Sequence, residues 1–121
     1  MKKILVIEDD SKLLNVYVQL FSGEGFEIIQ APTGQEGLEA AKKNSPNVII
    51  LDIMLPIGKM NGFDVLEQLK MDQNLKNIPV VILTNLDSEI KTAMSMGASD
   101  YLVKSNSSID DIKQKVKKYL Q

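Results

Sequence analysis

The sequence predicts an α/β domain whose parallel sheet is covered by helices on both faces. Short apolar runs and longer segments of helical period alternate five times along the 121 residues. Three of the runs consist almost wholly of Ile, Val and Leu, which is typical of parallel strands buried on both faces. Five such units are too few for an eight-fold barrel, so we expect an open sheet.

Each apolar run predicts one strand. The runs are Ile4–Ile7, Phe26–Ile29, Val48–Leu51, Val80–Leu83 and Tyr101–Val103. The second run is the most mixed, as an edge strand would be. Right-handed crossovers between parallel strands place helices on both faces. We therefore expect a doubly wound, flavodoxin-like (βα)5 sandwich with five strands in the order 2-1-3-4-5.

Helix signals lie between the runs. Thr33–Glu36 and Ser108–Asp111 each place a hydroxyl three residues before an acid, which is typical of a capping box at a helix start. Asp87 is expected to cap the helix that runs to Met96, and Gly97 to end it. The first helix has an apolar side made of Leu13, Leu14, Val16, Val18, Leu20 and Phe21.

Composition narrows the function classes. A net charge of −2 argues against direct nucleic-acid binding, and all 14 basic residues are lysines, so no arginine fork can bind a phosphate. No apolar run approaches the length of a membrane span, and Glu8 closes the first run too early for a signal peptide. The chain has no cysteine and no histidine. A cytoplasmic protein without membrane contact is expected.

Polar residues follow four of the five predicted strands. Glu8, Asp9 and Asp10 come after the first, Asp52 after the third, Thr84 after the fourth and Lys104 after the fifth. In the order 2-1-3-4-5 these four strands are neighbours, and parallel sheets bind ligands beyond their carboxyl ends. We therefore expect these side chains at one edge of the sheet.

The chemistry of this set points to phosphoryl transfer. Clustered carboxylates repel one another unless a cation lies among them, and a donor set of oxygen atoms alone suits Mg²⁺. A carboxylate can act as a nucleophile toward phosphorus, and an ammonium and a hydroxyl can stabilise the charge on the phosphoryl oxygens. Taken singly, each residue has a plainer interpretation as a cap, a turn or a solvated charge. Together they predict that Asp52 is a phosphoryl acceptor beside Mg²⁺.

Four motifs carry a resemblance to a known family. They are "ILVIEDD" (4–10), "VIILDIMLP" (48–56), "VVILTN" (80–85) and "GASDYLVK" (97–104). Over residues 1–121 the chain resembles the receiver domain of two-component response regulators, as a single domain without an output domain. The resemblance implies a phosphorylation-switched signalling protein, rather than an enzyme, that assists its own phosphorylation and dephosphorylation.

The resemblance also assigns roles to the polar residues. It implies that Asp52 accepts a phosphoryl group from a histidine kinase or phosphotransfer protein. It implies that Asp9, Asp52 and the main-chain carbonyl of Met54 bind Mg²⁺, with Glu8 helping through water. Thr84 and Lys104 would hold the phosphoryl oxygens.

A switch and a partner face are implied as well. Thr84 and Tyr101 would form the switch, with Tyr101 turning inward on activation. The fourth helix, fifth strand and fifth helix would bind an unknown downstream protein, and the chain would be a monomer or weak dimer. Four lysines of the last helix lie on this face and equally suit the negative end of that helix: Lys113, Lys115, Lys117 and Lys118.

The chain departs from the family pattern at three places. Ser105 stands where the family usually has proline after the lysine, Asn85 replaces a small residue after the threonine, and Gly62 falls six residues after Pro56 rather than four. Because a non-proline cis bond costs about 2.5–4 kcal/mol, we expect the Lys104–Ser105 peptide to be trans.

Three other functions compete for the same residues. An aspartate-nucleophile phosphatase generally needs a second acid where Met54 stands. A flavin-binding electron carrier needs a phosphate loop after the first strand, which "EDD" does not provide. An interaction module that is not phosphorylated stays open, since the longer loop and Asn85 could accompany lost activity.

Overall fold

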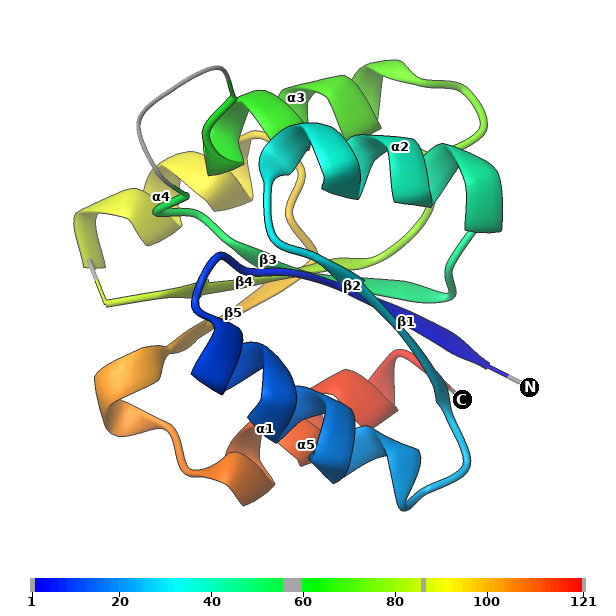
Figure 1. Cartoon of the computed structure of the whole chain (residues 1–121). Coiled ribbons are helices and arrows are strands. Elements are labelled where there is room, and N and C mark those ends of the chain that lie inside the picture. Colours follow the sequence, from blue (N-terminus) through cyan, green and yellow to red (C-terminus); the bar gives the residue numbers. More distant parts are fainter. Residues whose placement is uncertain (1, 56–59, 86, 121) are drawn as a thin grey trace.

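The sheet has five parallel strands in the order β2-β1-β3-β4-β5, as the sequence predicts (Figure 1). The computed structural model describes residues 2–55, 60–85 and 87–120. The strands are β1 (Lys3–Ile7), β2 (Glu27–Ala31), β3 (Val48–Asp52), β4 (Val80–Thr84) and β5 (Asp100–Val103). All five residues of β3 and of β4 are buried, whereas the edge strand β2 is partly exposed.

Helices cover both faces of the sheet (Figure 1). The helices are α1 (Ser11–Ser22), α2 (Gly34–Asn44), α3 (Gly62–Met71), α4 (Asp87–Ser95) and α5 (Ile109–Lys118), with a 3₁₀ turn, η1 (Lys104–Asn106), before α5. Alternate strand residues serve the two faces: Leu5 and Ile7 pack in the core under α2, α3 and α4, and Ile4 and Val6 in the core over α1 and α5. This is the doubly wound sandwich that the alternating pattern predicts.

Side-chain caps fix where the helices begin. Thr33 accepts the N–H of Glu36 at the start of α2, and Ser108 forms a complete capping box with Asp111 at the start of α5, both as predicted. Asn61 forms a second complete capping box, with Asp64, at the start of α3. The capping role predicted for the Asp87 side chain lies outside the described residues, and so do residues 56–59 of the longer loop predicted at 56–62.

The predicted end of α4 is confirmed. Gly97 has a φ of +106°, in the left-handed region, and the N–H of Ala98 reaches back to the carbonyl of Ala93 at 3.1 Å. This six-residue closure satisfies a carbonyl of the last turn, which is how glycine commonly ends a helix.

The buried side of α1 differs from the prediction. Leu14 and Phe21 are buried as expected, but the third buried residue is Tyr17, which is 1% exposed and was not among the predicted apolar residues. Val16 and Leu20 are only partly buried. The Tyr17 hydroxyl finds no hydrogen-bond partner among the described residues.

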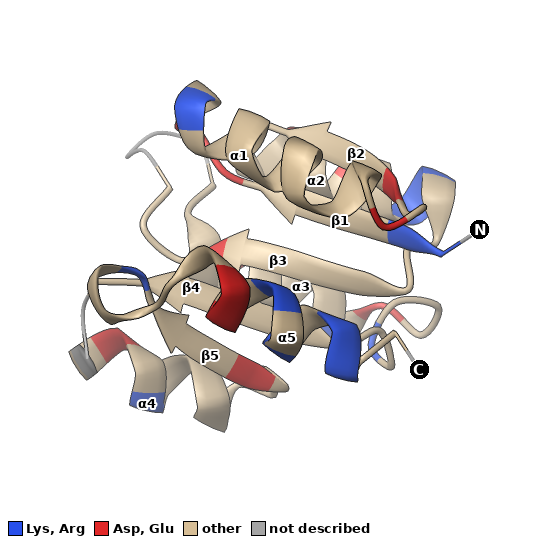
Figure 2. Cartoon of the chain, turned by 90° about the horizontal axis from the view of Figure 1, so that it is seen from below, with Lys and Arg blue, Asp and Glu red and all other residues tan. Residues whose placement is uncertain are grey.

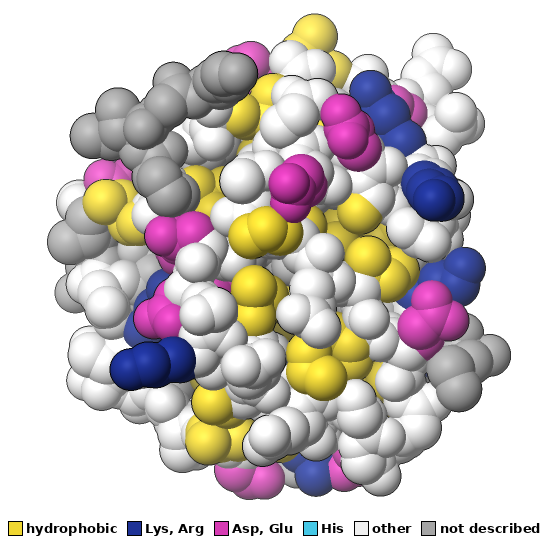
Figure 3. Space-filling view, viewed as in Figure 1, with side chains coloured by type: hydrophobic (Ala, Val, Ile, Leu, Met, Phe, Trp, Pro, Cys, Tyr) yellow, Lys and Arg dark blue, Asp and Glu magenta, His cyan; other side chains and the backbone are white. Residues whose placement is uncertain are grey.

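Large apolar groups are scattered over the described surface. Among the described residues, five large hydrophobic ones are exposed, and in Figure 3 the hydrophobic side chains of one face lie among polar and charged ones. They are Met54, Met71, Met94, Tyr101 and Ile109. Within the described part of the chain, no helix has the length and apolar character needed to cross a membrane.

Candidate functional site

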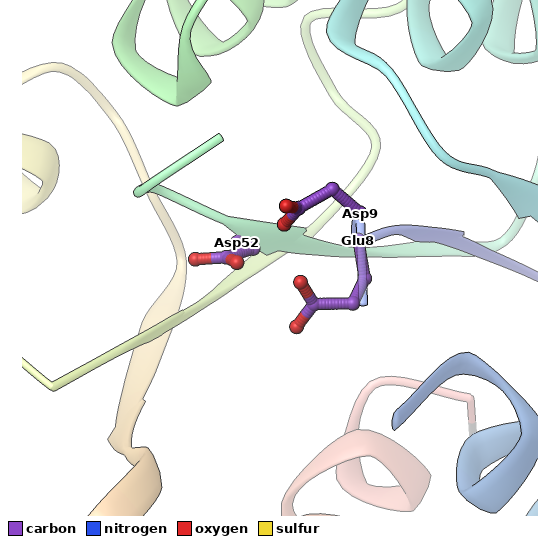
Figure 4. A group of neighbouring side chains, drawn as sticks. All are labelled: Glu8, Asp9 and Asp52. Atoms are coloured by element: carbon purple, nitrogen blue, oxygen red, sulfur yellow. The ribbon is translucent and has the colours of Figure 1, made fainter. Parts of the chain in front are cut away.

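Three carboxylates lie together beyond the ends of β1 and β3 (Figure 4). Glu8 directly follows β1, Asp9 comes next, and Asp52 is the last residue of β3. Glu8 is 1% exposed and Asp52 4% exposed, while Asp9 faces solvent. One carboxylate oxygen from each lies within 4.8 Å of the others. Two buried acids and one exposed acid therefore share one small region.

Local contacts fix the position of Asp52. Its Oδ1 accepts the N–H of Met54 at 2.9 Å, so the chain turns directly after the strand. Gly62, the first residue of α3, packs against the backbone of Ile53; a Cβ there would lie 2.4 Å from the Ile53 Cα. Only glycine permits this approach, which holds the start of α3 against the turn that carries Asp52.

Asp10 has a different task from its two neighbours. Its Oδ1 accepts the N–H groups of Lys12 at 2.9 Å and Leu13 at 3.3 Å, so it is the N-cap of α1. The plainer interpretation of acids after a first strand thus applies to Asp10. Glu8 and Asp9 remain in the carboxylate cluster.

Lys104 joins the cluster from the end of β5. Its Nζ lies 2.9 Å from Glu8 Oε1 and 3.1 Å from Asp52 Oδ2. Burial disfavours the ammonium, but its contacts with Glu8 and Asp52 outweigh burial and raise the pKa of Lys104. The ammonium therefore stays charged and bridges the two buried carboxylates.

One ammonium does not balance this set of carboxylates. Burial, together with the hydrogen bond and charge of Asp52, raises the pKa of Glu8 from 4.5 to about 8, although Lys104 acts in the opposite direction. The arrangement offers closely spaced hard oxygen donors and an uncompensated negative charge. It thus fits a divalent cation such as Mg²⁺.

Thr84 and Tyr101, the two further residues that the resemblance assigns to the site, occupy different environments. Thr84 ends β4, is fully buried and pairs with Val103 in the parallel ladder. Tyr101 is 40% exposed on β5, and Lys115 Nζ lies 5.7 Å from its ring centroid. The tyrosine ring therefore faces outward, away from the core.

Most of the α5 lysines that the sequence places on a partner face make contacts within the chain. Lys113 forms an ion pair with Glu24, Lys117 lies 3.7 Å from the same carboxylate, and Lys115 lies 3.1 Å from Asp100. Figure 2 shows the basic residues toward the C-terminal half of α5 and acidic ones at its start, as a helix dipole favours.

Two contacts of the structure were not predicted, one beside the site and one at the opposite end of β5. Asn85 Oδ1 accepts the N–H of Ser105 at 2.9 Å, and Tyr119 donates its hydroxyl to Asp100 Oδ2 at 2.9 Å. The sequence does carry a signal for the first, since both residues depart from the family pattern and each follows a site residue. The Lys104–Ser105 peptide is trans as predicted, and no described peptide bond is cis.

Comparison with known proteins identifies the family. The model of the response regulator receiver domain matches residues 4–117. The receiver domain of the Francisella response regulator 1452 is 32% identical, with a TM-score of 0.87 over 98% of this chain and 96% of that one. The receiver domain of the sensor histidine kinase PA1611 from Pseudomonas aeruginosa has the same fold at 19% identity, with a TM-score of 0.86 over 98% and 96% of the two chains. That structure has a magnesium ion coordinated in its active site cleft.

A longer relative matches over only part of its length. The alkaline phosphatase synthesis transcriptional regulatory protein PhoP of Bacillus subtilis is 33% identical over 105 residues, which make up 85% of this chain and 42% of PhoP. The chain thus spans less than half of that regulator. The matched segment, the fold and the acidic edge of the sheet agree, and the chain belongs to the receiver domain family of two-component response regulators, which signals through phosphorylation.

Proposed function

We propose that Asp52 is the phosphoryl acceptor of this receiver domain and that a histidine kinase or phosphotransfer protein is the donor. One observation carries the proposal: the buried Asp52 carboxylate lies within 4.8 Å of Glu8 and Asp9 and 3.1 Å from Lys104. A nucleophile of this kind needs a fixed carboxylate and positive charge for the incoming phosphoryl oxygens.

The transfer step forms one bond and breaks one. A lone pair of an Asp52 carboxylate oxygen attacks phosphorus, and the bond from phosphorus to the donor atom breaks, its electron pair leaving with the donor. With a phosphohistidine donor, the nitrogen of the leaving imidazole keeps that electron pair. The imidazole is neutral when one of its two nitrogens carries a proton. The product is an acyl phosphate on Asp52. The negative charge of the carboxylate is thereby replaced by the negative charge of the attached phosphoryl group.

Asp9, Asp52 and the main-chain carbonyl of Met54 are proposed to hold Mg²⁺, with Glu8 assisting through water. The close carboxylate oxygens fit a hard cation. When bound, the ion neutralises charge on the phosphoryl oxygens. Glu8 must lose its proton to take part, so its raised pKa links cation binding to proton release.

Lys104 and Thr84 are proposed to hold the phosphoryl oxygens. The Lys104 ammonium already contacts Asp52, so it can contact an oxygen of the acyl phosphate after only a small movement. Thr84 is the last residue of the neighbouring strand β4, so it lies at the same end of the sheet as Asp52. Movement of Thr84 toward the phosphoryl group, with Tyr101 turning inward from its outward position, forms the proposed switch.

The switched surface is proposed to be the face of α4, β5 and α5, which binds a downstream protein. Tyr101 and Lys115 lie there in contact, so an inward turn of the ring would break their cation–π contact and change that surface. The chain is proposed to be reset by hydrolysis: water attacks phosphorus, inorganic phosphate leaves, and the Asp52 carboxylate is restored. It would act as a monomer or weak dimer.

The test uses the whole chain, a small phosphoryl donor and intact mass. Acetyl phosphate with Mg²⁺ should add one acid-stable, base-labile phosphoryl group to the wild type, and EDTA should prevent it. Asp52→Asn should not be labelled, whereas the matched control Asp110→Asn, at an exposed aspartate in α5, should be labelled like wild type. Labelling of Asp52→Asn at the wild-type rate would show that the acceptor is another residue. An unlabelled wild type would favour the interaction module instead.

A further inference from the structure

We propose that Asn85 is a positioning residue that ties the loop carrying Thr84 to the turn carrying Lys104. This inference rests on the proposed function of those two residues. Asn85 Oδ1 accepts the backbone N–H of Ser105 at 2.9 Å. Asn85 directly follows Thr84, and Ser105 directly follows Lys104. One hydrogen bond therefore joins the two segments that would hold the phosphoryl oxygens.

The hydrogen bond between Asn85 and Ser105 lies directly beyond the last residue pair of β4 and β5. Thr84 and Val103 form the last pair of the β4–β5 ladder, so the backbone offers no further ladder bond beyond them. The Asn85 side chain supplies a carbonyl in place of the next backbone carbonyl. It thus extends the connection between the two strands by one step past their ends.

The bond also caps the turn after β5. The first N–H groups of a helix or 3₁₀ turn have no partner within it. Val103, at the cap position of η1, makes no side-chain hydrogen bond to the turn. Asn85 provides the missing oxygen from a neighbouring segment. Without it, Ser105 would present an unpaired donor to solvent and the turn would be less firmly placed.

The hydrogen bond between Asn85 and Ser105, which we call the clasp, depends on the residue types at both positions. Proline at position 105 would have no N–H to donate, and a small apolar side chain at position 85 would have no acceptor. This chain has both partners. Because Lys104 reaches Glu8 and Asp52 through a long side chain, a shift of its backbone would misplace the ammonium. A misplacement of about 1 Å can slow a reaction strongly.

The experiment compares Asn85→Ala, Ser105→Pro and the double variant, with Asn106→Ala as a matched control in the same exposed turn. Initial labelling rates are measured by intact mass over a series of acetyl phosphate concentrations with saturating Mg²⁺. Each single variant should lower the maximal rate between about twofold and tenfold, the range of one hydrogen bond. The double variant should fall no further, because both changes remove the same bond.

Two additional measurements separate positioning from general damage. The Mg²⁺ dissociation constant, measured by thermal shift, should stay at the wild-type value in Asn85→Ala, since the proposed ligands lie on the segments after β1 and β3. Amide exchange by NMR should be faster at Ser105 in Asn85→Ala and unchanged in Asn106→Ala. The first measurement shows that the metal site is intact, and the second reports on the Asn85–Ser105 hydrogen bond itself.

The outcomes distinguish this inference from the proposed function. If wild type is labelled and Asn85→Ala is labelled equally fast, the clasp has no positioning role although Asp52 remains the acceptor. Effects of Asn85→Ala and Ser105→Pro that multiply in the double variant would also overturn it. If wild type is not labelled at all, the proposed function fails and the clasp has no reaction to serve.

Discussion

Two aspartates at opposite edges of the sheet show how differently the same side chain can be accommodated. Asp100 begins β5 and Asp52 ends β3. Because the strands are parallel, Asp100 lies at the edge formed by the amino ends of the strands and Asp52 at the edge formed by their carboxyl ends. One carboxylate, Asp100, receives three donors: the N–H of Tyr101, the hydroxyl of Tyr119 and the ammonium of Lys115. Burial alone would raise its pKa, but these bonds outweigh burial and hold the pKa of Asp100 below 3.8.

The cluster around Asp52 has the reverse ratio. Three carboxylates lie together there with one ammonium, which contacts two of them, and the pKa of Glu8 rises to about 8. The Asp100 cluster is complete within the chain and serves stability. The Asp52 cluster holds more carboxylates than its one ammonium can pair, which is the condition that a cation-binding site needs.

The largest expected effect is on the pH dependence of folding without metal. Between its ordinary pKa of 4.5 and about 8, Glu8 holds a proton in the folded chain that the unfolded chain has released. Stability from this group is therefore present at low pH and is lost as the pH rises toward about 8. Glu8→Gln removes this dependence, because glutamine stays neutral.

Urea unfolding in EDTA at several pH values measures this difference. The unfolding free energy of Glu8→Gln relative to wild type should grow by a few kcal/mol across this window, since each pKa unit corresponds to about 1.4 kcal/mol. Asp100 has the opposite sign: its contribution is present above 3.8 and is lost only as the pH falls further. Parallel profiles for wild type and Glu8→Gln would mean that Glu8 is ionised normally.

The next largest effect is the difference in stabilisation by Mg²⁺ between variants at the two edges. At about a hundred times its dissociation constant, Mg²⁺ should stabilise wild type by roughly 2.7 kcal/mol through linkage. Asp100→Asn should gain the same amount, whereas Asp9→Asn should gain much less because it has lost a proposed ligand. Thermal melting at equal ionic strength measures the gain. Equal gains in all three proteins would place the cation elsewhere.

A smaller effect is expected from two tyrosine hydroxyls. Tyr119 donates to Ser99 O at 3.2 Å and to Asp100 Oδ2 at 2.9 Å, so Tyr119→Phe should cost about 1–2 kcal/mol. Tyr17 is the matched control, because its buried hydroxyl has no partner among the described residues. Tyr17→Phe should be at least as stable as wild type. An equal loss of unfolding free energy in both variants would show that the hydrogen bonds of the Tyr119 hydroxyl do not stabilise the fold.

The sequence predicted what depends on strand and helix periodicity. The strand order, the caps at Thr33 and Ser108 and the stop at Gly97 follow from local patterns and are all present. The meeting of Glu8, Asp9, Asp52 and Lys104 follows in turn, because the strand order alone brings their strand ends together.

What the sequence did not predict depends on side-chain contacts between segments. Nothing in the pattern of α1 distinguishes Tyr17 as a core residue, since its ring suits a core and its hydroxyl suits the surface. The Asn85–Ser105 bond and the bonds from Lys115 and Tyr119 to Asp100 link segments 15 to 20 residues apart, and their geometry is set only when the sheet forms. The acidic partners of three α5 lysines, Glu24 and Asp100, likewise come from other segments of the chain.

The most direct test of the comparison is the same substitution at both edges, melted in EDTA. Asp52→Asn removes one charge from a crowded cluster and leaves Lys104 paired with Glu8, so its melting temperature should rise. Asp100→Asn removes the charge that Lys115 and Tyr119 surround, so its melting temperature should fall. A change of 1 kcal/mol corresponds to roughly 3–6 °C for a chain of this length. Opposite signs are the predicted result, and a fall of similar size in both variants would contradict the account.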